Sequence, residues 1–235
     1  MQKAFGLIHS PAVGPATWEP VAVCLRAEGS TVAVPDLRSV SEADPPYWHE
    51  VVVRACGALR KAAAGHSLVL CAHSNAGLLL PAIWAGLDRQ VAAFIFVDAS
   101  VPPERGAAAK VPAEHLAKLR LKVNDGRLPR WTEWFSEDDI SVLFPDEATR
   151  RRVSDEQRKL PLAYYEEAVP IPAGWTEVPS GYLVFGPPYD SVAAEARRRG
   201  WLQRQVPGKH LHMLMDPSTV AAVLSEMAAS LVVTD

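Results

Sequence analysis

Short, continuous apolar runs recur along the chain and alternate with segments of helical spacing. These runs lie at residues 4–8, 31–34, 67–72, 91–97 and 181–185, and a further strand is expected at 202–206. Strands that are apolar on both faces are typical of parallel sheets covered by helices on both sides. The pattern therefore predicts an α/β fold with a mostly parallel six-stranded sheet.

The segments between these runs have apolar residues at helical spacing. Helices are expected at residues 15–27, 47–64, 75–86, 191–199 and 217–232. Ligands of open parallel sheets bind at the carboxyl ends of the strands. His9, Ser74 and Asp98 each follow or end an apolar run, so we expect them at one edge of the sheet.

Residues 102–179 interrupt the alternation. They contain scattered prolines, charge clusters and many of the aromatic residues, with no strong strand signal. Short helices are expected at 112–123 and 146–159. Because this segment lies between two strands of the sheet, it predicts a helical cap inserted before the last two strands. The expected division is a core of 1–101 and 180–235 and a cap of 102–179.

Composition excludes several classes of protein. The 235 residues carry 24 basic and 27 acidic side chains, which rules out a strongly basic nucleic-acid footprint. The most apolar stretch, 76–87, contains Pro81 and is too short to span a membrane. The run at 4–8 is too short for a signal-peptide core. We expect no nucleic-acid or membrane partner; a homo-oligomer is compatible with the sequence.

The cysteine and histidine positions give no metal or disulfide pattern. Cys24, Cys56 and Cys71 are widely spaced and odd in number, which favours three core residues in a reducing cytoplasm. The scattered His49, His66 and His115 form no metal constellation. No phosphate-binding glycine loop is present. The sequence therefore predicts no metal and no cofactor.

The stretch A-H-S-N-A-G joins an apolar run to a predicted helix and carries Ser74. A tight strand-to-helix turn exposes a serine there, while the small Ala72 and Ala76 leave room for the crossing backbones. The Asn75 N–H at the helix start would lie where negative charge develops. The alternative is that Ser74 merely caps the helix, but its context favours a nucleophile.

A second candidate segment, G-K-H-L-H-M-L-M-D-P, follows the last expected strand and contains two histidines. A serine nucleophile needs a base within hydrogen-bonding distance. His210 stands just after the strand, at the expected edge, and is the favoured base. His212 is its competitor, with packing beside Leu211 as the alternative role. For His9 we predict a structural role in fixing the first loop.

Together, the A-H-S-N-A-G segment, the early H-S-P-A-V-G-P-A-T-W and the late G-K-H-L-H-M-L-M-D-P resemble the α/β-hydrolase superfamily. The resemblance runs from about residue 4 to residue 232 and looks like the compact six-stranded form. It implies that Ser74 is the nucleophile and His210 the general base. The superfamily includes esterases, thioesterases, lactonases, hydroxynitrile lyases and non-catalytic receptors.

One position departs from the family pattern. The early motif usually supplies a backbone N–H to the oxyanion, but here Pro11 has none. The expected oxyanion hole consists of the Asn75 N–H and the Ser10 hydroxyl. Hydroxynitrile lyases of this fold also have a hydroxyl residue after the early histidine, which keeps lyase chemistry open.

Two aspartates compete to orient His210. Asp190 follows the 181–185 run, where most members of the superfamily carry the acid, but it also precedes a helix and could be an N-cap. Asp98 ends a wholly apolar run, so its carboxylate needs a partner such as an imidazole N–H. Both remain candidates, and we prefer Asp98.

These features predict a serine hydrolase that cleaves a small or mid-sized apolar ester, thioester or lactone through an acyl-enzyme. Trp131, Trp134 and Phe135 are expected to form an apolar wall of the small-molecule site, with anchoring of the cap as their alternative role. One alternative function is a cofactor-free lyase or cyclase that uses Ser74 and His210 for proton transfer. The second alternative is a non-catalytic small-molecule-binding scaffold.

Overall fold

The computed structural model describes residues 3–62 and 65–232 and contains a six-stranded sheet. The strands are β1 (Lys3–Ile8), β2 (Thr31–Ala33), β3 (Ser67–Ser74), β4 (Val91–Ala99), β7 (Ser180–Val184) and β8 (Leu202–Gln205). Their spatial order is β2-β1-β3-β4-β7-β8, and every neighbouring pair is parallel. The predicted six-stranded parallel sheet is confirmed.

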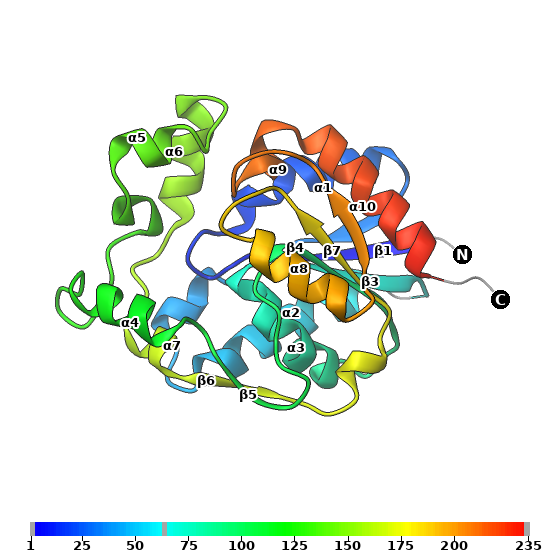
Figure 1. Cartoon of the computed structure of the whole chain (residues 1–235), viewed down its shortest axis with the longest axis horizontal. Helices are drawn as coiled ribbons and strands as arrows, with labels where there is room; N and C mark the ends of the chain where they lie inside the picture. The colour runs from blue at the N-terminus through cyan, green and yellow to red at the C-terminus, as the bar shows by residue number, and fades with distance from the viewer. Residues whose placement is uncertain (1–2, 63–64, 233–235) are drawn as a thin grey trace.

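Helices cover both faces of this sheet (Figure 1). The helices α1 (Glu19–Ala27) and α10 (Pro217–Leu231) pack together on one face, whereas α2 (Tyr47–Ala62), α3 (Leu80–Gly86) and α8 (Asp190–Arg198) cover the other. The last two residues of the helix expected at 47–64 lie outside the described residues. Within the described chain, no helix has the length and apolarity needed to cross a membrane.

The apolar character of the strands follows from this two-sided cover. Side chains alternate between the faces of a strand. In β1, Phe5 and Leu7 pack into the core beneath α1 and α10, while Ala4 and Ile8 pack into the core beneath α2 and α3. All four side chains are buried, so both faces of the strand require apolar residues.

Two expected helices are divided in the structure. The segment expected at 75–86 begins as a 3₁₀ helix, η3 (Asn75–Leu79), and continues as α3. The segment expected at 15–27 is divided in the same way into η1 (Pro15–Thr17) and α1. Pro81 and Pro20 explain the division, because proline lacks an N–H and is tolerated in the first turn of a new helix.

The inserted segment, residues 102–179, is mainly helical and lies to one side of the sheet, in green and yellow-green in Figure 1. Its helices are α4 (Ala113–Arg120), η4 (Trp131–Trp134), α5 (Glu137–Ser141), α6 (Glu147–Glu156), α7 (Ala163–Glu166) and η5 (Trp175–Glu177). Strands also form here, although the segment has no strong strand signal. An antiparallel pair forms between β5 (Gly106–Ala109) and β6 (Ala168–Ile171). The G-A-A-A sequence of β5 has low β-propensity, so pairing with a distant partner creates this strand.

Candidate active site

Ser74 ends β3 in a strained backbone conformation. Its φ of 60° and ψ of −134° are unusual for a residue with a side chain. The helical segment η3 starts at the next residue, so Ser74 stands on a tight strand-to-helix turn. Gly77 is required beside it, because an added Cβ would collide with the carbonyl oxygen of Ser100. The turn directs the Ser74 hydroxyl into a pocket.

Asp98 reaches the same site through a β-bulge. His73 pairs with Val97 and Ser74 pairs with Ala99, so Asp98 is an extra residue in β4. Its φ is 44°, also in the left-handed region. Bulges change the direction of a side chain, and they are frequent beside active sites. The Asp98 side chain is fully buried, and both of its oxygens accept hydrogen bonds.

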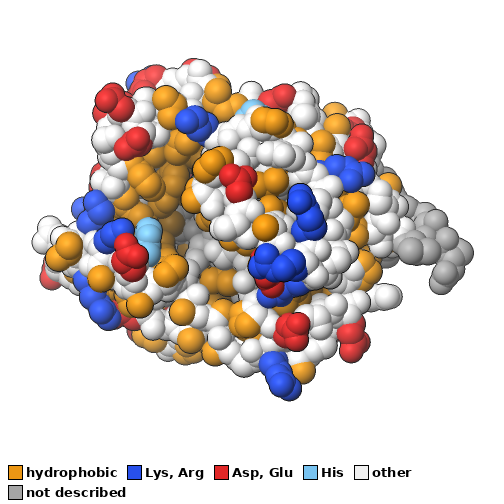
Figure 2. Space-filling view, viewed as in Figure 1, with side chains coloured by type: hydrophobic (Ala, Val, Ile, Leu, Met, Phe, Trp, Pro, Cys, Tyr) orange, Lys and Arg blue, Asp and Glu red, His pale blue; other side chains and the backbone are white. Residues whose placement is uncertain are grey.

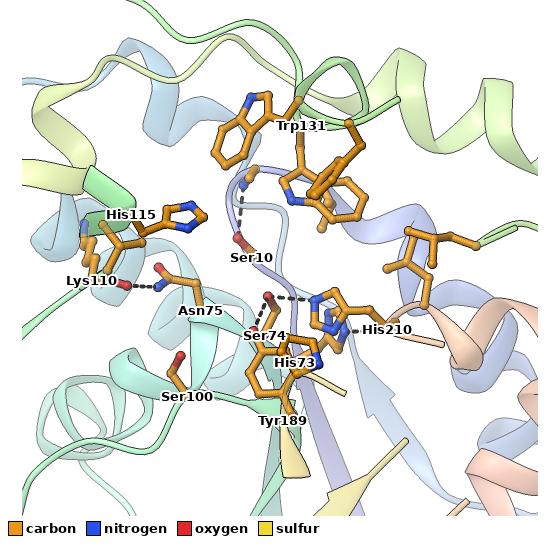
Figure 3. A pocket seen from close by; sticks show the side chains of 18 of the residues that line it. Ser10, His73, Ser74, Asn75, Ser100, Lys110, His115, Trp131, Tyr189 and His210 are labelled. Carbon is orange, nitrogen blue, oxygen red and sulfur yellow. Dashed lines mark hydrogen bonds between the residues drawn. The ribbon is translucent and has the colours of Figure 1, made fainter. Parts of the chain in front are cut away.

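His210 connects these two side chains. Its Nδ1 lies 2.7 Å from Asp98 Oδ2, and its Nε2 lies 3.0 Å from Ser74 Oγ (Figure 3). The second Asp98 oxygen accepts the Phe185 N–H at 3.0 Å. A carboxylate only accepts, so the neutral imidazole has its proton on Nδ1 and a lone pair on Nε2. This arrangement can accept the proton of the Ser74 hydroxyl.

Of the two candidate acids, the one hydrogen-bonded to His210 in the structure is Asp98. Asp190 is exposed and begins α8. Asp190 also does not cap the helix, because Tyr189 occupies that position. An acidic residue in the first turn favours the helix electrostatically, which is sufficient to explain Asp190.

The other histidines named from the sequence lie around the site. His9 is fully buried; its Nδ1 donates to Ser10 O at 2.8 Å and its Nε2 accepts the Leu37 N–H at 3.3 Å. Burial lowers the pKa of His9 to about 4, so it is neutral and fixes the first loop, as predicted. His212 begins the short helix α9 (His212–Met215) and packs against the Phe185 ring.

Two ring contacts of His210 have no clear signal in the sequence. Tyr189 stacks on its imidazole, with ring centroids 5.0 Å apart and planes 8° apart. His73 lies 4.4 Å away and donates Nε2–H to the His210 carbonyl oxygen at 2.8 Å. Burial lowers the pKa of His73 well below its ordinary value, so this ring is neutral.

A cavity of about 690 Å³ opens above Ser74. Trp131, Trp134 and Phe135 all line it, as the sequence predicted for them. Figure 2 shows the corresponding hollow, with largely hydrophobic walls, beside the inserted segment. Trp134 is also anchored, because its indole N–H donates to the Pro129 carbonyl oxygen at 2.9 Å. The wall and anchoring roles therefore coexist in this residue.

The first loop and the start of η3 flank Ser74. Pro11 lies in a turn in which the Ala12 N–H donates to Ser10 Oγ at 3.3 Å and the Val13 N–H donates to Ser10 O at 3.0 Å. The Ser10 hydroxyl therefore accepts one bond and keeps its own proton for another partner. Asn75, at the first position of η3, has a backbone N–H without an intrahelical acceptor.

An ion pair within the inserted segment was not predicted, and one of its partners also binds the core. Lys110 Nζ is 2.6 Å from Glu167 Oε1 and lies 3.3 Å from the centroid of the Tyr164 ring. Glu167 also accepts the backbone N–H groups of Tyr47 and Trp48 at the start of α2, each at 2.8 Å. Burial lowers the pKa of Lys110 to about 8. These contacts hold the cavity wall against α2.

The carbonyl oxygen of Lys110 completes this attachment. It accepts the side-chain amide of Asn75 at 2.5 Å, so the residue after Ser74 is bound to the inserted segment. Among the described residues, no group of three or more histidine, cysteine or carboxylate side chains is arranged to hold a metal ion.

Comparison with solved structures identifies the fold. An extracellular α/β-hydrolase from a Paenibacillus species superposes with a TM-score of 0.74 at 16% identity, covering 96% of this chain and 98% of its own. A methylesterase from Arabidopsis has a TM-score of 0.72 at 17% identity, with 97% and 100% covered. Tomato methylketone synthase I, bound to 2-tridecanone, has a TM-score of 0.74 at 14% identity, with 98% and 99% covered.

The sequence matches no protein-family model, and no curated protein matches it. The structural comparisons span nearly the whole chain at low identity. The chain therefore has the α/β-hydrolase fold, as the sequence motifs predicted.

Proposed function

We propose that this protein is a serine hydrolase that cleaves an apolar ester through an acyl-enzyme. The observation that carries the proposal is the hydrogen-bonded chain from Ser74 to His210 to Asp98, with its two links of 3.0 and 2.7 Å. A nucleophile, a base and a group that orients the base are the three parts that acyl transfer requires. The esterases among the solved structures of this fold agree with the proposal.

The chemistry follows from the position of each proton. His210 Nε2 takes the proton of Ser74 Oγ as this oxygen attacks the substrate carbonyl. The resulting imidazolium is stabilised by the buried carboxylate of Asp98. His210 then gives its proton to the leaving oxygen, and the acyl-enzyme remains. In the second half, His210 takes a proton from water as the water oxygen attacks the acyl carbonyl. The bond to Ser74 Oγ then breaks, His210 returns the proton to Ser74 Oγ, and the carboxylic acid is released.

Two donors serve the oxyanion in this proposal. The first is the backbone N–H of Asn75, next to the nucleophile. The second is the hydroxyl of Ser10, which replaces the N–H that Pro11 lacks and whose proton is not used by its own turn. Removing a donor of this kind costs about 2.7–4 kcal/mol of transition-state stabilisation.

The cavity suggests the class of substrate. Aromatic and aliphatic side chains make up most of its walls, although charged side chains such as Lys110 and Asp139 also line it. The ligand in this proposal is a small or mid-sized apolar ester, thioester or lactone. The inserted segment acts as the cap that shapes this cavity. We place the protein in the reducing cytoplasm because Cys24, Cys56 and Cys71 are all free thiols.

A lyase or cyclase is the second candidate. The observation that favours it is the Ser10 hydroxyl facing the cavity in place of a backbone donor. In that reaction, Ser74 and His210 move a proton without forming an acyl-enzyme. A covalent acyl intermediate, trapped from an aryl ester and detected by mass spectrometry, separates hydrolysis from this alternative.

The test of the hydrolase combines a fluorophosphonate probe with the Ser74→Ala variant. The wild type should be labelled at Ser74 and should hydrolyse short-chain aryl esters. The folded variant, checked by circular dichroism, should lose both properties, while Ser225→Ala, at a half-buried position of α10 that does not line the cavity, should keep them. More than about a tenth of the activity surviving in Ser74→Ala would contradict the nucleophile assignment.

A further inference from the structure

One side chain contacts both Ser74 and His210 from the side opposite Ser10. The Tyr189 ring stacks on the His210 imidazole, and its hydroxyl oxygen lies 3.5 Å from Ser74 Oγ. In Figure 3, Tyr189 lies below Ser74, and Ser10 lies above it. His73 also contacts the His210 ring. The centroid of the His210 ring is 5.0 Å from that of Tyr189 and 4.4 Å from that of His73.

We propose that Tyr189 is a positioning residue for this pair, its ring fixing the plane of the His210 imidazole and its hydroxyl holding Ser74 Oγ. The role rests on the proposed function, since it concerns the geometry of the proposed nucleophile and base. It adds a residue from the loop after β7 to a site otherwise built from β3, β4 and the loop after β8.

The need for such a residue follows from where His210 stands. It lies on a loop after β8, and its link to Asp98 fixes only the position of Nδ1. The ring can still tilt about that bond and move Nε2 away from Ser74. A flat ring at 8° to the imidazole opposes this tilt. A displacement of about 1 Å in a catalytic group can cost about 100-fold in rate.

Tyr189 is well anchored for this task. Its N–H donates to the Gly186 carbonyl oxygen at 3.0 Å, and its own carbonyl oxygen accepts the Ala193 N–H at 2.9 Å. It is the N-cap residue of α8. The backbone is therefore fixed on both sides, and the ring is presented to His210 by the end of a helix.

The ring and the hydroxyl contribute unequally. Burial raises the pKa of the Tyr189 phenol, so it remains a neutral donor at neutral pH. Its 3.5 Å distance to Ser74 Oγ exceeds the usual 2.7–2.8 Å of such bonds, which makes this contact weak in the resting site. The stacked ring is thus expected to provide most of the effect.

His73 also contacts the His210 ring, and it does so without adding charge. Its Nε2–H is bonded to the His210 carbonyl oxygen, and its lowered pKa keeps it neutral while His210 becomes protonated during the reaction. The imidazolium would then lie beside a neutral imidazole and a phenol ring. A cation over an aromatic face is attracted to it, so the stack is also compatible with the charged form.

The experiment compares Tyr189→Phe, which keeps the ring, with Tyr189→Leu, which removes it. The readouts are the rate of Ser74 labelling by a fluorophosphonate and the separate kcat and KM for an aryl ester. We expect Tyr189→Leu to lower the labelling rate and kcat by about 10- to 100-fold with little change in KM. Tyr189→Phe should retain both within about threefold.

Tyr165→Leu is the matched control. Tyr165 lines the same cavity, but its ring contacts are with Trp134 and Tyr164. It should alter KM and leave the labelling rate within about threefold of the wild type. This control separates loss of a cavity wall from loss of base positioning, and thermal melting confirms that each variant is folded.

Crystal structures of the two Tyr189 variants provide a readout that needs no turnover. Tyr189→Phe should keep His210 Nε2 beside Ser74 Oγ, and Tyr189→Leu should let it move away. The proposal would be overturned if His210 does not move in the Tyr189→Leu structure. It would also be overturned if folded Tyr189→Leu keeps a kcat within threefold of the wild type. A Phe variant as impaired as the Leu variant would overturn it as well. A wild type that the probe does not label refutes the hydrolase instead, while the crystal structures still decide the positioning role.

Discussion

Replacing Asp98 with asparagine tests the proposed role of this carboxylate most directly. Both oxygens of Asp98 accept hydrogen bonds, one from the Phe185 N–H at 3.0 Å and one from His210 Nδ1–H at 2.7 Å. Asparagine has one acceptor and one donor in their place. In either orientation of the amide, one of these two N–H groups faces an NH₂ group.

The energetics decide which orientation dominates. If the amide oxygen stays with Phe185, His210 can respond by moving its proton from Nδ1 to Nε2, and every group is then paired. If the oxygen faces His210, the buried Phe185 N–H is left unpaired, which costs about 1–3 kcal/mol. The first arrangement dominates, and it leaves no lone pair on Nε2 to take the Ser74 proton. At about 1.36 kcal/mol per tenfold change, this penalty alone reduces the active tautomer by roughly 5- to 150-fold.

Loss of the negative charge that stabilises the imidazolium adds to this effect. We therefore expect kcat of Asp98→Asn to fall by about 10²–10⁴, the upper figure being that of an analogous substitution in a serine protease. Asp190→Asn is the control, because Asp190 is an exposed residue in the first turn of α8. Its expected cost is about 0.3–1 kcal/mol of stability with kcat unchanged.

The assay is aryl-ester hydrolysis under saturating substrate, with thermal melting of each variant in parallel. The reasoning would be refuted if Asp190→Asn has the strongly lowered kcat and Asp98→Asn loses only stability. A normal kcat for both variants would refute it as well, because it would leave the oriented imidazole without a role.

Two further predictions concern stability and the cavity. The free energy of unfolding should fall as the pH drops from 6.5 to 4, because neutral, buried His9 has a folded pKa of about 4 while the unfolded chain binds the proton near 6.5. His9 contributes about 3 kcal/mol to this loss of stability, and His73 acts in the same direction. The measurement is urea unfolding across this pH range, and a free energy of unfolding that does not change with pH would contradict the prediction. Trp134→Ala should change the ratio of kcat/KM between long and short acyl chains more than it changes Tm, whereas equal losses for all chain lengths would indicate anchoring alone.

The features that could be predicted from the sequence are local ones. Five of the six strands follow from apolar runs that the two-sided helical cover requires, whereas the edge strand β8 has the mixed sequence L-Q-R-Q. Ser74 could be found because an apolar strand, a serine between small residues and a helix are contiguous in the chain. His210 could be found from its place just after the last strand. In each case, the residues that determine the geometry lie within about ten positions of one another.

The features that could not be predicted depend on contacts between distant segments. The strand β5 exists because it pairs with β6, some sixty residues away, and its own sequence gives no strand signal. The Lys110–Glu167 ion pair joins two segments whose charges look like ordinary surface residues in the sequence. Tyr189 contacts Ser74, which lies 115 positions earlier in the chain, and His210, which lies 21 positions later.

The choice between Asp98 and Asp190 links these observations. In the family, the acid usually comes from the loop after the strand that corresponds to β7, and that loop carries Asp190 here. The bulge in β4 instead turns Asp98 toward His210. This bulge requires Asp98 to adopt a left-handed backbone conformation, for which the sequence has no signal. With the carboxylate supplied from β4, the loop after β7 no longer needs to provide one. It places Tyr189 against the imidazole, so in the proposed site β4 supplies the carboxylate and the loop after β7 supplies the stacked ring.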